Sequence, residues 1–349
     1  MKRQRKLNKT KAGRNKIRHL RSRNKDFSLS ARRKPAKKEE KKIDRPVYKT
    51  PEELIEERSS FPEAVKKEIS HIRTTLSNTA IANELRSGRR DLRKLKIVTI
   101  DSEETKDVDD GVSICRLEDG KFELGVHIAD VAHYVKEGTE LDLEAYKRGT
   151  SVYLVDKVLP MLPQKLSNGI CSLNVGENRF ALSIIMTINK KGYVESYDIF
   201  ESLICVAYKI TYKQITALFE GDSAFYKQKD LEKEYAGHLE DIRLMRELAE
   251  VRHNMRYQRG AVDFEFPETH VTTDDNGKPI DIAEDSVNFA NNIIEEFMLA
   301  ANETIAEHFA KLKVPFMFRI HGSPEPTKLM DLSTSVRSMG YTLRGEGSD

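Results

Sequence analysis

The sequence predicts a mixed fold of strands and helices, α/β or α+β, from about residue 90 to the end. Apolar, β-branched runs separated by turn residues occupy 96–204, as expected of several strands. After them, 231–257 and 293–305 repeat apolar residues every three or four positions, which is the period of an amphipathic helix. A chain of 349 residues with 38% apolar residues can bury one large core or two ordinary ones.

The individual elements follow from local signals. Four segments have strand character: 96–100, 111–115, 181–188 and 193–204. A further apolar run over 122–135 is also expected to be extended, because Asp119-Gly120 before it favours a hairpin turn. A short helix is expected over 139–148, since Thr139 begins a capping-box pattern and Gly149 favours a helix end.

The first part of the chain differs sharply in charge from the rest. Residues 1–45 hold 20 Lys/Arg and 4 Asp/Glu, a net charge of +16, and the remaining residues carry −13. We expect residues 1–49 to form a disordered basic arm that binds polyanions, the alternative being a solvated leader without a specific partner. Residues 50–90 are expected to form a helical joint, with Thr50 and Pro51 at the first helix start.

Composition argues against several classes of protein. No apolar run reaches the roughly 18 residues of a membrane-spanning helix. The N-terminus is charged from its second residue, which is not typical of a secretory signal. The three cysteines are widely spaced, without a CxxC pair, so neither a disulfide framework nor a structural zinc site is expected. We therefore expect a cytoplasmic protein.

An acidic loop over 101–110, DSEETKDVDD, is the main candidate for chemistry. It holds six carboxylates and one lysine directly after an apolar strand. If partly buried, carboxylates this close raise each other's pKa, and a divalent cation relieves that repulsion. Oxygen ligands without His or Cys favour Mg²⁺ or Mn²⁺ over zinc.

Other readings of these polar residues remain open at this point. An acidic surface turn is the commonest fate of such a run. An EF-hand is excluded by register, since glycine falls at position five rather than six when Asp107 is position one. His127, Asp130 and His133 could suggest a metal site, but the two histidines lie too far apart along a strand to share one ion. We interpret these residues as structural, or as groups that support metal ligands without binding the ion.

Several motifs, in one consistent order, resemble the catalytic (RNB) domain of ribonucleases II and R. They are IVTIDSEETKDVDDGVSI, LGVHIADVAHYV, RGTSVYLVDKVLPMLPQKLSNGICSLN, QRGAVDFEFPE, EEFMLAAN and FRIHGSPEP. The resemblance runs from about Phe61 to Tyr341. It implies an α+β fold with a mixed sheet and long helices, in which residues 91–349 form the N-terminal part of an RNB catalytic domain.

The resemblance also implies an activity and its residues. The expected activity is a processive, Mg²⁺-dependent, hydrolytic 3′-to-5′ exoribonuclease that degrades single-stranded RNA to nucleoside 5′-monophosphates. Asp101, Asp107, Asp109 and Asp110 match the family's catalytic, metal-binding aspartates, and Asp109 is expected to be indispensable. Four residues match RNA-contacting positions, namely Tyr153, Phe264, Glu295 and Arg319. Without the resemblance the two aromatics would be read as core residues and Glu295 as a solvated acid.

The sequence also departs from the family pattern. Cys205 and Lys209 stand where the family usually has serine and arginine. The family continues beyond the equivalent of Tyr341 through an arginine-bearing segment, HFTSPIRRY, to an OB domain, and has two cold-shock-type domains before the catalytic one. Two hypotheses follow: an exoribonuclease, impaired or completed by a C-terminal fragment in trans, or an inactive truncated product that binds RNA non-specifically through its basic arm.

Overall fold

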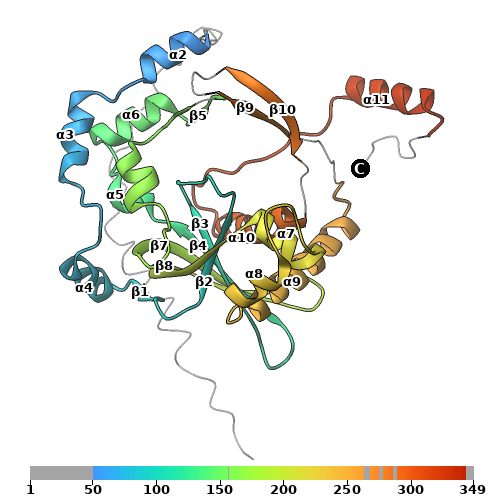
Figure 1. Cartoon of the computed structure of the whole chain (residues 1–349), viewed down its shortest axis with the longest axis horizontal. Helices are drawn as coiled ribbons and strands as arrows, with labels where there is room; N and C mark the ends of the chain where they lie inside the picture. Colours follow the sequence, from blue (N-terminus) through green and yellow to red (C-terminus); the bar gives the residue numbers. More distant parts are fainter. Residues whose placement is uncertain (1–49, 156, 263–267, 275–277, 286–288, 343–349) are drawn as a thin grey trace, which may run out of the picture. The chain divides into compact units, whose positions relative to one another are not determined.

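The computed structural model describes residues 50–155, 157–262, 268–274, 278–285 and 289–342 (Figure 1). The basic arm expected at 1–49 lies outside the described residues, as does Phe264.

The segment expected to form a helical joint is helical, but it is divided into three helices. They are α2 (Pro51–Arg58), α3 (Glu63–His71) and α4 (Asn78–Ser87). Ser77 begins α4 because its hydroxyl accepts a hydrogen bond from the Ala80 N–H, and Gly88 ends it at a φ of 114°. The helix α3 buries Val65 against the main domain.

One six-stranded sheet forms the centre of the domain. Its strands are β1 (Arg90–Asp91), β2 (Ile97–Asp101), β3 (Asp110–Arg116), β4 (Phe122–Ala129), β7 (Asn178–Ile188) and β8 (Val194–Thr211), in the order β1-β8-β2-β3-β4-β7. Two small antiparallel pairs lie outside it: β5 (Val152–Tyr153) with β6 (Val158–Leu159), and β9 (Glu268–Thr273) with β10 (Pro279–Asp285). The expected mixed α+β architecture is confirmed.

The long strand β8 closes the sheet on itself. Residues 194–205 of β8 pair antiparallel with β7, and residues 206–211 pair parallel with β2. The strands β2, β3, β4 and β7 are antiparallel neighbours between these two contacts. Strand β8 therefore fixes β2, and the acidic loop that follows it, relative to the rest of the sheet.

Two predicted elements are wrong in extent. The apolar run over 122–135 is not one extended segment, because β4 ends at Ala129 and α5 (Val131–Tyr134) begins at once. The Asp130 carboxylate causes this change by capping α5 through the His133 N–H. The helix expected over 231–257 is two helices, α8 (Gln228–Glu234) and α9 (Leu239–Gln258), with the helix-breaking Gly237 between them.

Other predicted helices are confirmed. The helix α6 (Glu140–Arg148) is capped by Thr139, whose hydroxyl accepts from the Asp142 N–H, and ends at Gly149. The last long segment forms α10 (Phe289–Leu312). A short π-helix, η2 (Lys165–Ile170), stands between β6 and β7.

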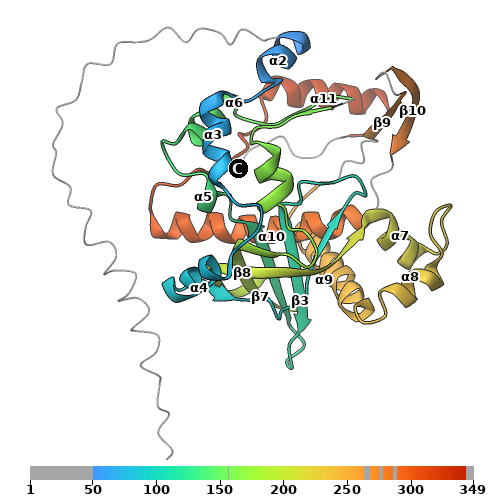
Figure 2. The same ribbon diagram turned by 60° about the vertical axis from the view of Figure 1, so that its left-hand side comes forward.

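Helices pack on the sheet, and the buried apolar residues between them form two main clusters. One cluster joins the sheet to α7 (Tyr212–Glu220), α9 and α10, and Figure 2 shows α10 running beside the strands. The other joins it to α3, α6 and η2. Strand β2 serves both, because Val98 and Ile100 enter the first cluster and Ile97 the second, as the two-residue period of a strand requires.

The part of the chain after α10 exposes much apolar surface. Helix α11 (Pro326–Ser338) has no buried residue. The large apolar residues exposed from residue 313 onward are Val314, Phe316, Met317, Phe318, Ile320, Leu329, Met330, Leu332, Met339 and Tyr341. We call these residues the C-terminal apolar surface. None of the helices in the described ranges is long and apolar enough to cross a lipid bilayer.

Candidate active site

The acidic loop connects two adjacent strands of the central sheet. Asp101 is the last residue of β2 and Asp110 the first residue of β3. The two strands pair through Val98 and Val112, and the backbone of Asp101 pairs with Thr211 of β8. The sheet thus holds both ends of the loop, and Asp107 and Asp109 lie on the segment between them.

Backbone contacts fix the second half of this loop. Val108 is buried, and its N–H donates to the Ser172 hydroxyl at 3.1 Å while its carbonyl accepts from the Leu173 N–H at 2.9 Å. The Ser172 hydroxyl also donates to the Lys106 carbonyl at 2.8 Å. On the next residue, the Asp109 carbonyl accepts from the Ala129 N–H at 2.9 Å. An inward Val108 aims the side chains of its two neighbours away from the core.

Burial and mutual repulsion raise the pKa of three of the carboxyls. Burial is the larger cause for the raised pKa of Asp101, with the charges of Asp109 and Asp107 adding to it. Burial, then the charge of Asp107, raises the pKa of Asp109. For Asp110, burial together with the charges of Asp101 and Asp109 raises the pKa to about 6. Asp101, Asp109 and Asp110 therefore lie in an environment in which negative charge is unfavourable, and the charge of Asp107 contributes to it at Asp101 and Asp109.

A lysine lies in this environment. The Lys209 ammonium on β8 donates to the Thr105 carbonyl in the loop at 3.1 Å, and its charge lowers the pKa of Asp101 against the effect of burial. The sequence identified Lys209 only as a departure from an arginine. The structure shows that it anchors the first half of the acidic loop.

The aspartates fit a hard divalent cation as a set of donors. All are oxygen ligands, and the buried Oδ2 of Asp101 has no hydrogen-bond partner. Across the described residues, no three Asp, Glu, His or Cys side chains are already gathered closely enough to coordinate one ion. An ion would therefore be bound by small movements of side chains whose backbone the sheet already positions.

Tyr153 is the aromatic residue that the structure brings to the acidic loop. It lies on β5, is 68% exposed, and its hydroxyl donates to Oδ2 of Asp107 at 3.2 Å. Burial of the hydroxyl end and the charge of Asp107 raise the pKa of Tyr153, so the phenol keeps the proton it donates. An exposed ring beside the carboxylates is not a core residue, and it is free to stack on a base.

In the described part of the chain, Glu295 and Arg319 make no hydrogen bond or ion pair with the aspartates. Phe264 lies outside the described residues. Glu295 on α10 is paired with Arg256 of α9 at 3.8 Å rather than with the aspartates. Arg319 lies exposed in the segment between α10 and α11. The roles proposed for these three residues remain predictions.

Sequence reasoning missed two residues near the loop. Tyr212, at the start of α7, is close enough to the acids that burial and the charges of Asp101 and Asp110 raise its pKa to about 12. Ser172 is the hydroxyl that binds the loop backbone on two sides. Ser172 lies in one of the motifs that carry the resemblance and Tyr212 lies within its range, but their positions in the sequence carry no separate signal.

The interpretation of His127 as structural is supported. It is fully buried between the hydroxyls of Ser113 and Ser183, at 3.1 and 2.7 Å from its two ring nitrogens. Burial lowers the pKa of His127 to about 4, so the ring is neutral at physiological pH and holds three strands together.

Comparison with known proteins gives the family. The RNB domain family model matches residues 89–345. Ribonuclease R of Thermotoga maritima is 41% identical over 307 residues, which are 86% of this chain and 42% of that protein. This chain thus spans about two fifths of that relative's length.

Solved structures agree with this match. Mycoplasma genitalium RNase R in complex with ribose methylated single-stranded RNA has a TM-score of 0.75 and 26% identity, covering 85% of this chain and 45% of that one. The same protein in complex with double-stranded RNA has a TM-score of 0.74 and 26% identity, covering 85% and 51%. The match extends over the sheet, the acidic loop and the long helices. The chain belongs to the RNB domain family.

Proposed function

We propose that this protein is a hydrolytic 3′-to-5′ exoribonuclease that degrades single-stranded RNA to nucleoside 5′-monophosphates with the help of Mg²⁺. The observation that carries the proposal is the acidic loop, in which two aspartates at the ends of paired strands and two on the segment between them lie with an exposed aromatic ring hydrogen-bonded to Asp107. Two structures similar to this chain are of an RNase R bound to RNA, which supports RNA as the substrate.

In the proposed reaction, water adds to the phosphorus of the last phosphodiester bond. The bond from phosphorus to the 3′ oxygen breaks, and that oxygen takes a proton, so a nucleoside 5′-monophosphate leaves. Magnesium held by Asp101, Asp107, Asp109 and Asp110 would supply Lewis-acid stabilisation of the phosphate charge; Mn²⁺ fits the same donors.

The chain's own residues hold the reactants in place. The Tyr153 ring stacks on the terminal base without reading it, because every base has a π face. Its hydroxyl, bonded to Asp107, links the position of that base to the acidic loop. Lys209 keeps the first half of the loop against β8. Phe264, Glu295 and Arg319 are proposed as further RNA contacts on the resemblance alone.

The C-terminal apolar surface supports a second proposal, a polypeptide partner. We propose that it is covered by a segment equivalent to part of the longer relatives, acting as a complementing C-terminal fragment. In the absence of that segment, the apolar residues from 313 onward would meet water and activity would be weak.

A single assay tests the activity. Purified protein is incubated with a single-stranded oligoribonucleotide and Mg²⁺, alone and with the C-terminal portion of a ribonuclease R relative. We expect nucleoside 5′-monophosphates to be released, more rapidly with the added fragment, and EDTA to stop the release. If neither preparation releases a monophosphate, the proposal is wrong.

A second candidate function is favoured by charge alone. The net charge of +16 over residues 1–45 would bind RNA non-specifically even in a protein without catalysis. Deletion of residues 1–45 separates the two functions: under the exoribonuclease proposal it weakens RNA affinity but leaves monophosphate release from saturating RNA intact. In the binding-only alternative, it removes the one activity that the protein has.

Tyr153 gives a prediction specific to base stacking. Tyr153→Ala should raise KM for RNA roughly 5–100-fold, because stacking of one base contributes about 1–3 kcal/mol. Tyr153→Phe is the matched variant: it keeps the ring and loses only the bond to Asp107, so its KM should stay close to that of the wild type. Steady-state kinetics on an oligoribonucleotide measure both variants, and equal KM values for the alanine variant and the wild type would exclude a stacking role.

The proposed compartment is the cytoplasm. All three cysteines are free thiols, which fits a reducing environment.

For the buried Cys171, burial is the main cause that raises the pKa to about 12, so it is an inert core thiol rather than a nucleophile.

A further inference from the structure

A buried arginine outside the acidic loop connects several parts of the fold. Arg89 directly follows Gly88, the residue that ends α4, and is only 4% exposed although it carries a charge. A buried guanidinium is tolerated only when its N–H groups meet acceptors in a suitable geometry. Its contacts therefore show which groups it holds together.

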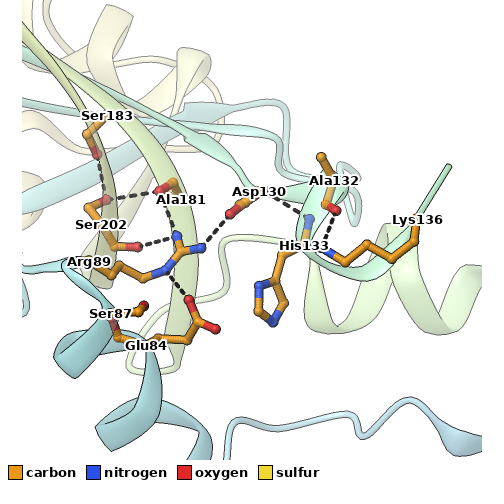
Figure 3. A network of polar contacts seen from close by, with 10 residues as sticks. All are labelled: Glu84, Ser87, Arg89, Asp130, Ala132, His133, Lys136, Ala181, Ser183 and Ser202. Carbon is orange, nitrogen blue, oxygen red and sulfur yellow. Dashed lines mark hydrogen bonds and ion pairs between the residues drawn. The ribbon is translucent and has the colours of Figure 1, made fainter. Parts of the chain in front are cut away.

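Figure 3 shows Arg89 among acceptors from three elements. One terminal nitrogen donates to the carbonyls of Ala181 in β7 and Ser202 in β8, at 3.2 and 3.1 Å. The other donates to Oδ2 of Asp130 at 2.7 Å, and Nε donates to Oε2 of Glu84 in α4 at 3.2 Å. Arg89 thus joins α4, the paired strands β7 and β8, and the residue after β4.

Asp130 carries this connection toward the acidic loop. Its second carboxylate oxygen accepts from the His133 N–H at 3.1 Å, and its own N–H donates to the Phe180 carbonyl at 3.0 Å. The neighbouring residue, Ala129, donates its N–H to the Asp109 carbonyl at 2.9 Å. One peptide unit therefore separates the group held by Arg89 from the bond that fixes Asp109.

The opposite side of the loop has a comparable support. Arg179, 2% exposed, donates to the Ser172 carbonyl at 2.7 Å and to the Gly169 carbonyl at 3.1 Å. Ser172 in turn binds the backbone at Val108. Each of the two backbone hydrogen bonds that orient the aspartates is thus supported by a buried arginine. Arg89 supports the bond from Ala129 to Asp109, and Arg179 supports the bond from Val108 to Ser172.

We propose that Arg89, acting through Asp130, is a positioning residue for the acidic loop: it holds the end of β4 that fixes the backbone of Asp109. This inference rests on the proposed function, to which it adds residues that touch neither RNA nor metal. Holding a catalytic group in place can change rate steeply, since a displacement of about 1 Å can cost 10²-fold.

The expected kinetic effect is a change in kcat alone. Arg89→Lys keeps the charge, but a single ammonium cannot reach the four acceptors that the planar fork serves. We expect kcat to fall about tenfold or more, as for other groups that orient a catalytic ligand. KM for RNA should stay unchanged, because Tyr153 and the other proposed RNA contacts are untouched.

Hydrogen–deuterium exchange tests the positioning itself, without catalysis. In the full chain with Arg89→Lys, peptides covering 126–133 and 101–112 should exchange about tenfold faster than in the wild type, because the bond from Ala129 to the Asp109 carbonyl opens more often and releases the loop. Arg252→Lys is the matched control. Arg252, which is 2% exposed, is likewise buried and donates to a backbone carbonyl, that of Gly192, but it lies on α9. That variant should leave both peptides unchanged.

Asp130→Asn provides a second route if Arg89→Lys does not fold. It removes the charge that Arg89 holds and keeps the size of the side chain, so it should give the same local increase in exchange. Unchanged exchange over 101–112 and 126–133 in a folded variant of either kind would overturn the proposal. The wild type itself could release no monophosphate while a variant still exchanges faster over these peptides. That result would uphold the positioning role and reject the proposed function.

Discussion

Asp109→Asn should lower kcat for nucleoside 5′-monophosphate release by at least about 10²–10³-fold, the usual cost of removing one group that stabilises transition-state charge. The amide keeps the size of the side chain but loses the negative charge that binds the metal. The fold should persist, because the contact that holds this residue uses its backbone carbonyl, which accepts from the Ala129 N–H. Single-turnover assays with Mg²⁺, in the preparation that shows wild-type activity, measure the effect.

A neighbouring acid provides the control. Glu104 lies exposed in the same loop and has no proposed ligand role, so Glu104→Gln removes the same charge and should leave kcat unchanged. Circular dichroism and thermal melting should show that both variants are folded. A wild-type kcat in Asp109→Asn would exclude a catalytic role for Asp109. Equal losses in the two variants would show that the acidic loop acts only through its general charge.

Asp110→Asn should make the metal-free protein more stable at pH 7, by about 1–3 kcal/mol in the free energy of unfolding. Burial and the neighbouring Asp101 and Asp109 raise the pKa of Asp110 to about 6, from 3.8 in an unfolded chain. The folded state thus holds its proton more tightly, and stability decreases as the pH rises from about 4 to about 6. Above that window the ionised carboxylate destabilises the fold, and partial exposure to water moderates the effect.

Denaturant unfolding at several pH values, with and without Mg²⁺, measures this difference. The variant's advantage should be largest near pH 7 and should shrink as the pH falls to 4 and below, where the wild-type carboxyl becomes protonated in the unfolded chain as well as in the folded one. Added Mg²⁺ should stabilise the wild type more than Asp110→Asn, since binding to the folded state adds to its stability. A variant that is less stable than the wild type at pH 7 without metal would contradict the arrangement of charges described here.

Strong local signals made part of the fold predictable. The segments 96–100 and 111–115 agree with β2 and β3 to within a residue at each end, because their apolar runs are bounded by the acidic loop. The helix after Thr139 was predictable from its cap and from Gly149. The strand expected at 193–204 instead continues to Thr211, since pairing with β2 overrides the polar residues in its last third.

The same distinction applies to the site. The aspartates could be found from the sequence because they are adjacent and follow a strand. Lys209, Ser172 and Arg89 act on the loop only through segments that are distant in the chain, so no local pattern reveals them. Tyr153 was identified through the resemblance alone, and its bond to Asp107 is a tertiary contact.

The double pairing of β8 also determines when the acidic loop can form during folding. Asp101 pairs with Thr211, 110 positions later, and this parallel contact closes a long loop of chain. Contacts between such distant segments form late, because the entropy of loop closure has to be overcome first. Hairpins such as β3–β4 and β7–β8 can form before it. A nascent or partly folded chain therefore has its aspartates but not their arrangement, so under the proposed function RNA hydrolysis would begin only after the last steps of folding.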